Sequence, residues 1–160
     1  MANMTSSDNA SLLLASEMSG SFGEAMVPVD VETVDTWVWL AYDQLNIAFL
    51  DALDLDGKVG VVLIESSHKA QRRPYHQQKL GVLLSNQRHF ALELQDAGIP
   101  VLYVMSSQTY PDVLKTVTDV LGPLDAFEHA ERSLRTSVQP LVDSGLLSVH
   151  PHPGWLTPRS

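Results

Sequence analysis

Three polar residues follow two apolar runs of the chain, at points where side chains can take part in chemistry. Asp43 and Gln44 come directly after residues 36–42, and Glu65 comes directly after residues 59–64. If both runs are strands of one open parallel sheet, their carboxyl ends meet at a single edge, which is where ligands bind in such sheets. Loops at that edge carry function more often than core residues do. We therefore expect the two carboxylates and the amide to face a ligand.

Both acids also have structural interpretations. Asp43 is a residue type that forms caps and turns, and Glu65 has two candidate ion-pair partners on the following segment, Lys79 and Arg88. A small hydrolase that uses Asp43 and a histidine is a further alternative. The residue types alone leave these alternatives open.

The helix expected after the second run places another set of side chains near the same edge. Four of its residues are spaced i, i+3, i+4 and i+7 and share one face: His76, Lys79, Leu80 and Leu83. The result is a pocket with Leu83 as an apolar floor, carboxylates on one rim and cations on the other. Such a pocket suits a flat, polar heteroaromatic ligand with a polyhydroxyl tail.

Several common site motifs are absent from the sequence. The chain has no GxGxxG after the first run, no GxxxxGK[ST] and no GxSxG, which removes the dinucleotide fingerprint, the P-loop and the nucleophile elbow. It has no cysteine, which excludes disulfides, thiol nucleophiles and cysteine-bound metal within it. His150 and His152 supply two metal ligands at most, so we expect no metal site.

The charge is acidic overall and uneven along the chain. The formal net charge of −9 argues against broad binding to nucleic acids or membranes, because their phosphates repel an acidic surface. Residues 66–92 nevertheless hold five of the ten Lys and Arg residues and no acid. This basic run is either the solvated face of a helix or a site for an anion or partner protein. No apolar run approaches the roughly 20 residues that span a bilayer, so we expect a cytoplasmic protein.

Alternating strand and helix patterns predict an α/β fold. Runs typical of strands occupy residues 36–42, 59–64, 101–105, 124–129 and 146–150. Helical patterns, each followed within two residues by a glycine, occupy residues 75–97, 111–121 and 131–143. This alternation predicts a three-layer, Rossmann-like domain with a five-stranded parallel sheet.

The domain is expected to span residues 35–158, with ordered structure beginning at Thr36. Residues 1–34 show little periodicity, so we expect a flexible extension with at most a short helix over residues 11–18. Residues 47–57 are expected to form a loop with at most one helical turn.

Four motifs occur in order along the chain: WVWLAYDQLN at 37–46, VLIES at 62–66, RPYHQQKL at 73–80 and QRHF at 87–90. They resemble the N-terminal domain of the cryptochrome/photolyase-related proteins, the iron–sulfur bacterial cryptochromes and (6-4) photolyases. The similarity continues to residues 154–157 and covers about residues 36–158. It implies a Rossmann-like fold of the photolyase N-terminal type, which agrees with the fold predicted from the patterns.

The resemblance also implies a function. In that family this domain holds a lumazine-type antenna chromophore that harvests light. A larger helical C-terminal domain, absent from these 160 residues, holds FAD and a [4Fe–4S] cluster. The parent activity is light-dependent, flavin-driven repair of DNA photolesions or blue-light sensing. The implied partners are that C-terminal domain or a split partner subunit, with damaged DNA bound only through the parent protein. The chain alone is not expected to be catalytic; a stand-alone α/β interaction module without chromophore is the alternative.

The resemblance and the helix face together give six candidate chromophore-binding residues: Asp43, Gln44, Glu65, Lys69, Lys79 and Leu83. By motif position, Asp43 and Gln44 match the DQ pair at the antenna pocket. Glu65 matches the acid that ends the second strand, and Leu83 matches the apolar helix residue that faces the antenna.

Two positions depart from the family pattern. Tyr42 stands where many members have glycine, and its ring narrows the expected pocket. Lys69 stands where some antenna-binding members carry an acid, which changes the hydrogen-bonding partner offered to a chromophore.

Overall fold

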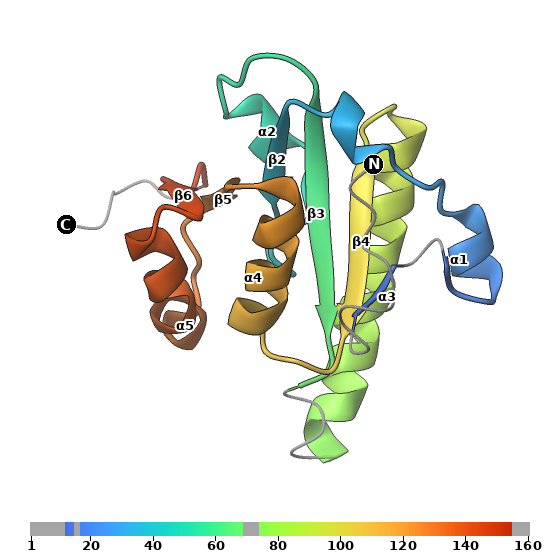
Figure 1. Ribbon diagram of the computed structural model, residues 1–160. Coiled ribbons are helices and arrows are strands. Elements are labelled where there is room, and N and C mark those ends of the chain that lie inside the picture. Colours follow the sequence, from blue (N-terminus) through green and yellow to red (C-terminus); the bar gives the residue numbers. More distant parts are fainter. Residues whose placement is uncertain (1–11, 15–16, 69–73, 155–160) are drawn as a thin grey trace.

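The computed structural model describes residues 12–14, 17–68 and 74–154. Its centre is a twisted sheet with the strand order β1-β4-β3-β2-β5-β6 (Figure 1). The strands are β1 (Leu12–Leu14), β2 (Thr36–Trp39), β3 (Val59–Ser66), β4 (Val101–Ser106), β5 (Leu124–Phe127) and β6 (Leu147–His150). Strands β2 to β6 are mutually parallel. The predicted five-stranded parallel sheet is therefore confirmed.

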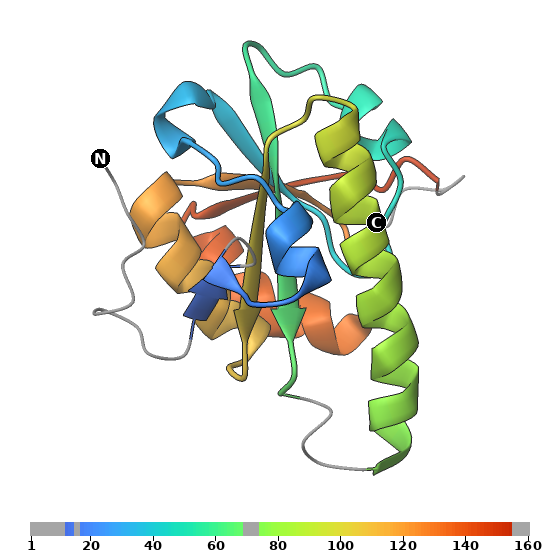
Figure 2. The same cartoon turned by 90° about the vertical axis from the view of Figure 1, so that its right-hand side faces the viewer.

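Helices cover both faces of the sheet and make three layers (Figures 1 and 2). The long helices are α3 (Pro74–Asp96), α4 (Tyr110–Leu121) and α5 (Arg132–Asp143). Helix α3 packs on one face, and α4 and α5 pack on the other. The short elements are α1 (Ser21–Ala25), η2 (Val31–Thr33) and α2 (Ala48–Asp51). No helix in the described ranges is long and apolar enough to cross a membrane.

Strand β3 shows why the sequence forms a sheet buried on both faces. Its side chains alternate between two separate cores: Val61 and Leu63 pack on the α3 side, whereas Val62 and Ile64 pack on the α4 and α5 side. Each of these four residues is at most 2% exposed. A parallel strand covered by helices on both faces requires apolar residues at every position, which is the pattern that this run has.

The length of α3 carries its amino end past the sheet. At about 1.5 Å per residue, its 23 residues span roughly 35 Å, whereas the eight residues of β3 span roughly 26 Å. The carboxyl end of α3 is fixed by Gly98, which has a φ of 79° and permits the turn into β4. The first turns of α3 therefore extend beyond the carboxyl ends of the strands (Figure 1).

Ordered structure begins before Thr36, contrary to the sequence prediction. Leu12–Leu14 pair antiparallel with β4 and add a sixth strand, so the prediction of a helix over residues 11–18 is wrong there. Met26, just after α1, is 5% exposed and joins the core on the α3 side. The Gln95 side chain bonds to the backbone on both sides of Met26. These contacts connect distant segments, so local periodicity did not reveal them.

The first strand ends earlier than predicted, at Trp39 rather than residue 42. Gln44 explains the difference: its Oε1 accepts a hydrogen bond from the Ala41 N–H, and its own N–H donates to the Ala41 carbonyl. The backbone thus turns at the point where strand pairing would have continued. The single helical turn expected within residues 47–57 is present as α2.

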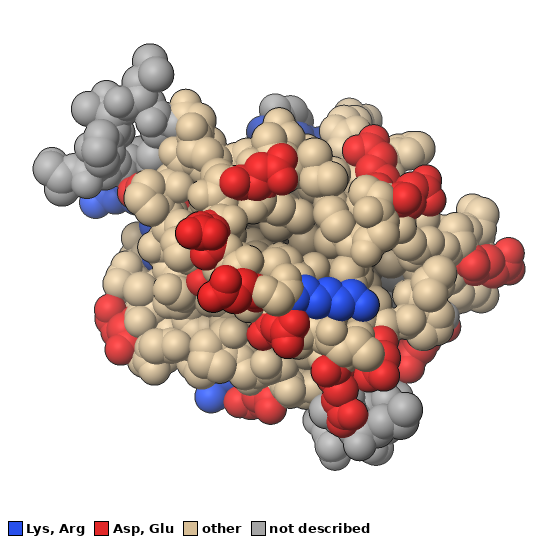
Figure 3. All heavy atoms as spheres, turned by 90° about the horizontal axis from the view of Figure 1, so that it is seen from above, with Lys and Arg blue, Asp and Glu red and all other residues tan. Residues whose placement is uncertain are grey.

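Acidic side chains predominate on the face beyond the amino ends of the strands (Figure 3). The loop that leads into β3 carries two acids, Asp54 and Asp56, followed by Lys58.

Candidate ligand-binding site

A cavity of about 600 Å³ lies beyond the carboxyl ends of the strands. Its walls come from the segment after β2, the end of β3, and helices α3, α4 and α5. Strands β3 and β4 lie on one side of β2, whereas β5 and β6 lie on its other side. The strand order therefore reverses between β2 and β5. Ligands of open α/β sheets bind at such a reversal, and the volume is within the range of small-molecule sites.

Two tyrosine rings form the aromatic part of the cavity wall. The Tyr42 and Tyr110 ring centroids are 6.4 Å apart, with the rings inclined by 34°. The Trp39 ring lies 6.0 Å from that of Tyr110 on the core side. Burial, then the nearby Glu131 carboxylate, raises the pKa of both phenols above the ordinary value. Both hydroxyls therefore stay protonated and able to donate at neutral pH.

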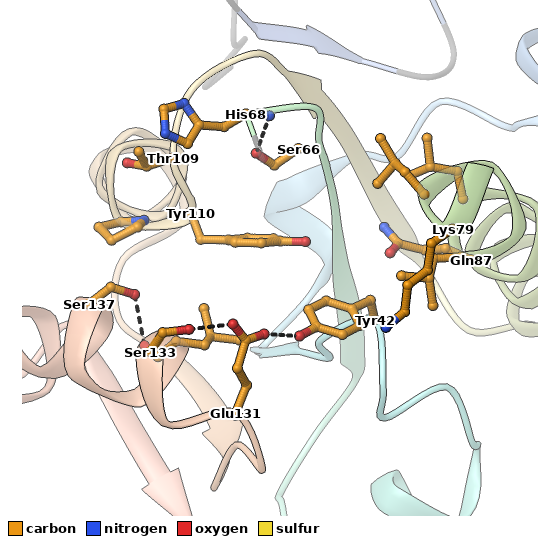
Figure 4. Close-up of a pocket in the computed structure, with 15 residues that line it drawn as sticks. Tyr42, Ser66, His68, Lys79, Gln87, Thr109, Tyr110, Glu131, Ser133 and Ser137 are labelled. Atoms are coloured by element: carbon orange, nitrogen blue, oxygen red, sulfur yellow. Dashed lines mark hydrogen bonds between the residues drawn. The ribbon is translucent and has the colours of Figure 1, made fainter. Parts of the chain in front are cut away.

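Glu131 supplies a carboxylate on the α5 side of the cavity. It accepts a hydrogen bond from the Tyr42 hydroxyl and another from the Ser133 hydroxyl. Its position at the start of α5 is favourable for a negative charge, because the helix dipole is positive at that end. The bond between Tyr42 and Glu131 joins the end of β2 to the start of α5 (Figure 4).

Helix α3 forms the opposite wall. Leu80, Leu83 and Leu84 line the cavity, as the helical spacing predicted for Leu80 and Leu83. Lys79 also lines it and is exposed. Deeper on the same helix, the Gln87 side chain is 2% exposed. Within the described structure, its Nε2 has no hydrogen-bond partner.

Of the six predicted site residues, Lys79 and Leu83 line this cavity. Asp43 is exposed and lies outside the cavity lining. Gln44 is 1% exposed, and its amide bonds to Ala41 N and to the Glu128 carbonyl. Gln44 thus ties the end of β2 to the end of β5, and its hydrogen bonds within the chain leave little capacity for a ligand.

Glu65 adopts the structural alternative, an ion pair. Its carboxylate accepts from Arg88 Nε at 3.0 Å and Nη2 at 2.7 Å, and from the Tyr103 hydroxyl at 2.6 Å. Hydrogen bonding to Glu65 raises the pKa of Arg88. The Arg88 guanidinium also lies 5.3 Å from the centre of the Phe22 ring. Glu65 lies among these partners, outside the cavity lining.

The remaining candidates divide between other contacts and undescribed positions. His150 Nε2 lies 2.7 Å from Asp125 Oδ1, and the His152 ring packs on Phe49. No group of three metal-ligating side chains occurs among the residues that the structure describes. Lys69 lies outside the described residues.

Sequence reasoning missed most of the residues that line the cavity, among them Gln87, Tyr110 and Glu131. Tyr110 comes four residues after β4 and Glu131 four residues after β5. A search of the whole loops beyond these strands, and not only of the residues directly after a strand, would have found them. Gln87 has a weaker signal: it interrupts the apolar side of α3 three residues after Leu84 and three before Phe90. A glutamine in such an apolar stripe is expected to have its side-chain amide in the protein interior, where it needs a hydrogen-bond partner.

A family model described as deoxyribodipyrimidine photo-lyase-related protein matches residues 38–160. The matched span begins within β2 and includes every element that lines the cavity. A search of curated proteins found no match.

Proposed function

Because the chain belongs to the deoxyribodipyrimidine photo-lyase-related protein family, we propose that it is the antenna-chromophore domain of a light-driven flavoprotein. The ligand of the cavity is a lumazine-type chromophore. The observation that carries this proposal is the cavity of about 600 Å³ at the reversal of strand order, walled by tyrosines on one side and leucines on the other.

The residues present fit such a chromophore. The flat ring packs against the Tyr42 and Tyr110 rings and the leucines of α3, because this contact removes aromatic and apolar surface from water. The hydroxyls of Thr109, Ser133 and Ser137 line the α4 and α5 side and suit a polyhydroxyl tail. Glu131 adds a carboxylate that accepts hydrogen bonds from such a tail.

The bound chromophore would supply light absorption and pass its excitation energy on. The chain's own residues bind it, fix the orientation of its ring and exclude water. Orientation is set by side chains on three separate helices, α3, α4 and α5. The Tyr42–Glu131 hydrogen bond holds two of the wall segments together, which limits the freedom of a ring bound beside them.

The parent activity belongs to the same proposal. We place the parent among the iron–sulfur bacterial cryptochromes and (6-4) photolyases, with light-dependent repair of DNA lesions or blue-light sensing as its activity. FAD and the [4Fe–4S] cluster lie in a helical domain or split subunit that partners this one. The 160 residues contain no cysteine and therefore no thiolate ligand for a cluster. Damaged DNA contacts the parent rather than this acidic chain.

A titration of the purified chain with a ribityl-lumazine and with riboflavin tests the proposal. We expect saturable binding that shifts the absorption spectrum of the lumazine. Leu83→Arg, which puts a long cation into the cavity, is expected to abolish that binding. Val82→Arg is the matched control, because Val82 is the neighbouring residue and is 62% exposed. No saturable binding by the unmodified chain would reject the chromophore role.

The interaction-module alternative has one observation in its favour. Val82, on α3, presents an apolar side chain to solvent. Under this alternative, Val82→Arg weakens association with a partner protein, and neither variant alters a ligand spectrum. The same pair of substitutions therefore separates the two functions.

A further inference from the structure

We infer that Gln87 and Tyr110 form a two-donor site for a neutral carbonyl oxygen on the ring of the ligand. This inference rests on the proposed function and deepens it, because it names the chemical group that the cavity selects. Neither residue belongs to the chromophore-binding set expected from the sequence.

The first observation is the burial of an unpaired donor. Gln87 is 2% exposed, and Nε2 has no partner among the described residues. Buried polar groups in folded proteins are nearly always hydrogen-bonded, and an unsatisfied one lowers the stability of the fold. A leucine at this position would continue the apolar stripe of α3 without that cost. A donor kept at this depth, on the wall of a cavity, is explained by a ligand that accepts from it.

The second observation is the direction of Tyr110. Its side chain crosses from the start of α4 toward α3, and its hydroxyl points to the same part of the cavity as the Gln87 amide (Figure 4). The raised pKa of this phenol, caused first by burial, keeps its proton in place. Two elements on opposite faces of the sheet thus aim a donor each at one region.

Two converging donors define the ligand atom between them. An amide Nε2 only donates, and a carbonyl oxygen has two lone pairs able to accept from two donors. An anionic acceptor is disfavoured, since the Glu131 carboxylate lines the same cavity and repels it. The cation of the lining, Lys79, is exposed, so solvent screens its attraction. The group selected is therefore a neutral ring carbonyl, as in a pyrimidine-dione edge.

The experiment uses the full chain and a ribityl-lumazine as the probe. Gln87→Leu removes one donor and Tyr110→Phe removes the other while keeping the ring. Gln78→Leu is the matched control, being the same substitution at an exposed position of α3. We expect each cavity variant to raise Kd about tenfold, as for one lost buried hydrogen bond, and the control to leave it unchanged. The infrared carbonyl band of the bound ligand should move to higher frequency in both variants.

The outcomes separate the two levels of the proposal. If the unmodified chain binds neither the lumazine nor riboflavin, both the proposed function and this inference fail. If it binds, but both cavity variants match Gln78→Leu in Kd and in the carbonyl band, only the two-donor site is overturned. Should Gln87→Leu not fold, Tyr110→Phe and Gln87→Met decide the question. Gln87→Met keeps an unbranched side chain of similar length and removes the donor, so we expect the same rise in Kd as for Gln87→Leu.

Discussion

Replacing Arg88 by methionine tests whether Glu65 is a structural residue or a ligand-binding one. The Glu65 side chain is 9% exposed and that of Arg88 is 35% exposed. Three hydrogen bonds reach the carboxylate, two from Arg88 and one from Tyr103. Arg88→Met keeps much of the aliphatic stem and removes the charge and both of its hydrogen bonds. The carboxylate is then left buried with one donor.

The size of the effect follows from that arrangement. Removing one partner of a fully buried ion pair costs about 3–5 kcal/mol. Because the Arg88 guanidinium keeps partial contact with solvent, we expect the lower end of this range, about 3 kcal/mol. For a domain of this size, each kcal/mol lowers Tm by about 2–4 °C, so the expected fall is about 6–12 °C.

Urea denaturation and calorimetry of the ligand-free chain measure this loss. Arg132→Met is the control, because Arg132 is exposed at the start of α5, and we expect its effect to stay within about 0.5 kcal/mol. A double-mutant cycle with Glu65→Gln isolates the coupling between the two side chains. Equal stability of the Arg88 and Arg132 variants would refute the structural role of the pair and leave Glu65 free for a ligand.

Three further predictions concern stability. Burial, then the charge of Arg135, lowers the pKa of His129 to about 4 from an ordinary 6.5. The unfolded chain therefore takes up a proton at this histidine at a higher pH than the folded one does. The free energy of unfolding should fall by on the order of 3 kcal/mol as the pH drops from 6.5 to 4. His129→Phe should flatten that part of a urea-measured pH profile, and an unchanged slope would contradict it. Gly57→Ala should destabilise by at least about 1 kcal/mol, since φ is 79° and a Cβ would meet Asp35. Gly81→Ala, mid-helix with open space around it, should instead add about 0.5–1 kcal/mol; opposite signs in calorimetry would overturn both assignments.

Local patterns in the sequence were enough for most of the fold. The apolar run at residues 59–64 and the helical spacing before Gly98 correctly predicted β3 and α3, because a strand buried on both faces and an amphipathic helix each leave a periodic signal. The edge of the sheet that carries the cavity also followed, since parallel strands connected by helices present their carboxyl ends together.

The sequence did not determine which polar side chains would be satisfied inside the chain. Glu65 and Gln44 occupy the positions expected of ligand-binding residues, yet their partners, Arg88 and the Glu128 carbonyl, lie 23 and 84 residues away. Such pairings depend on distances between elements, which no local spacing encodes.

The sequence by itself thus determined how strands and long helices alternate along the chain from residue 36 onward, and at which edge of the sheet a ligand would bind. Only the tertiary structure decided which side chains line the cavity, because Tyr42, Gln87, Tyr110 and Glu131 come from four separate segments. The same holds for β1, whose three residues are a strand because β4 offers them an edge to pair with. Side-chain convergence and edge pairing are properties of packing, and they arise only when the layers come together.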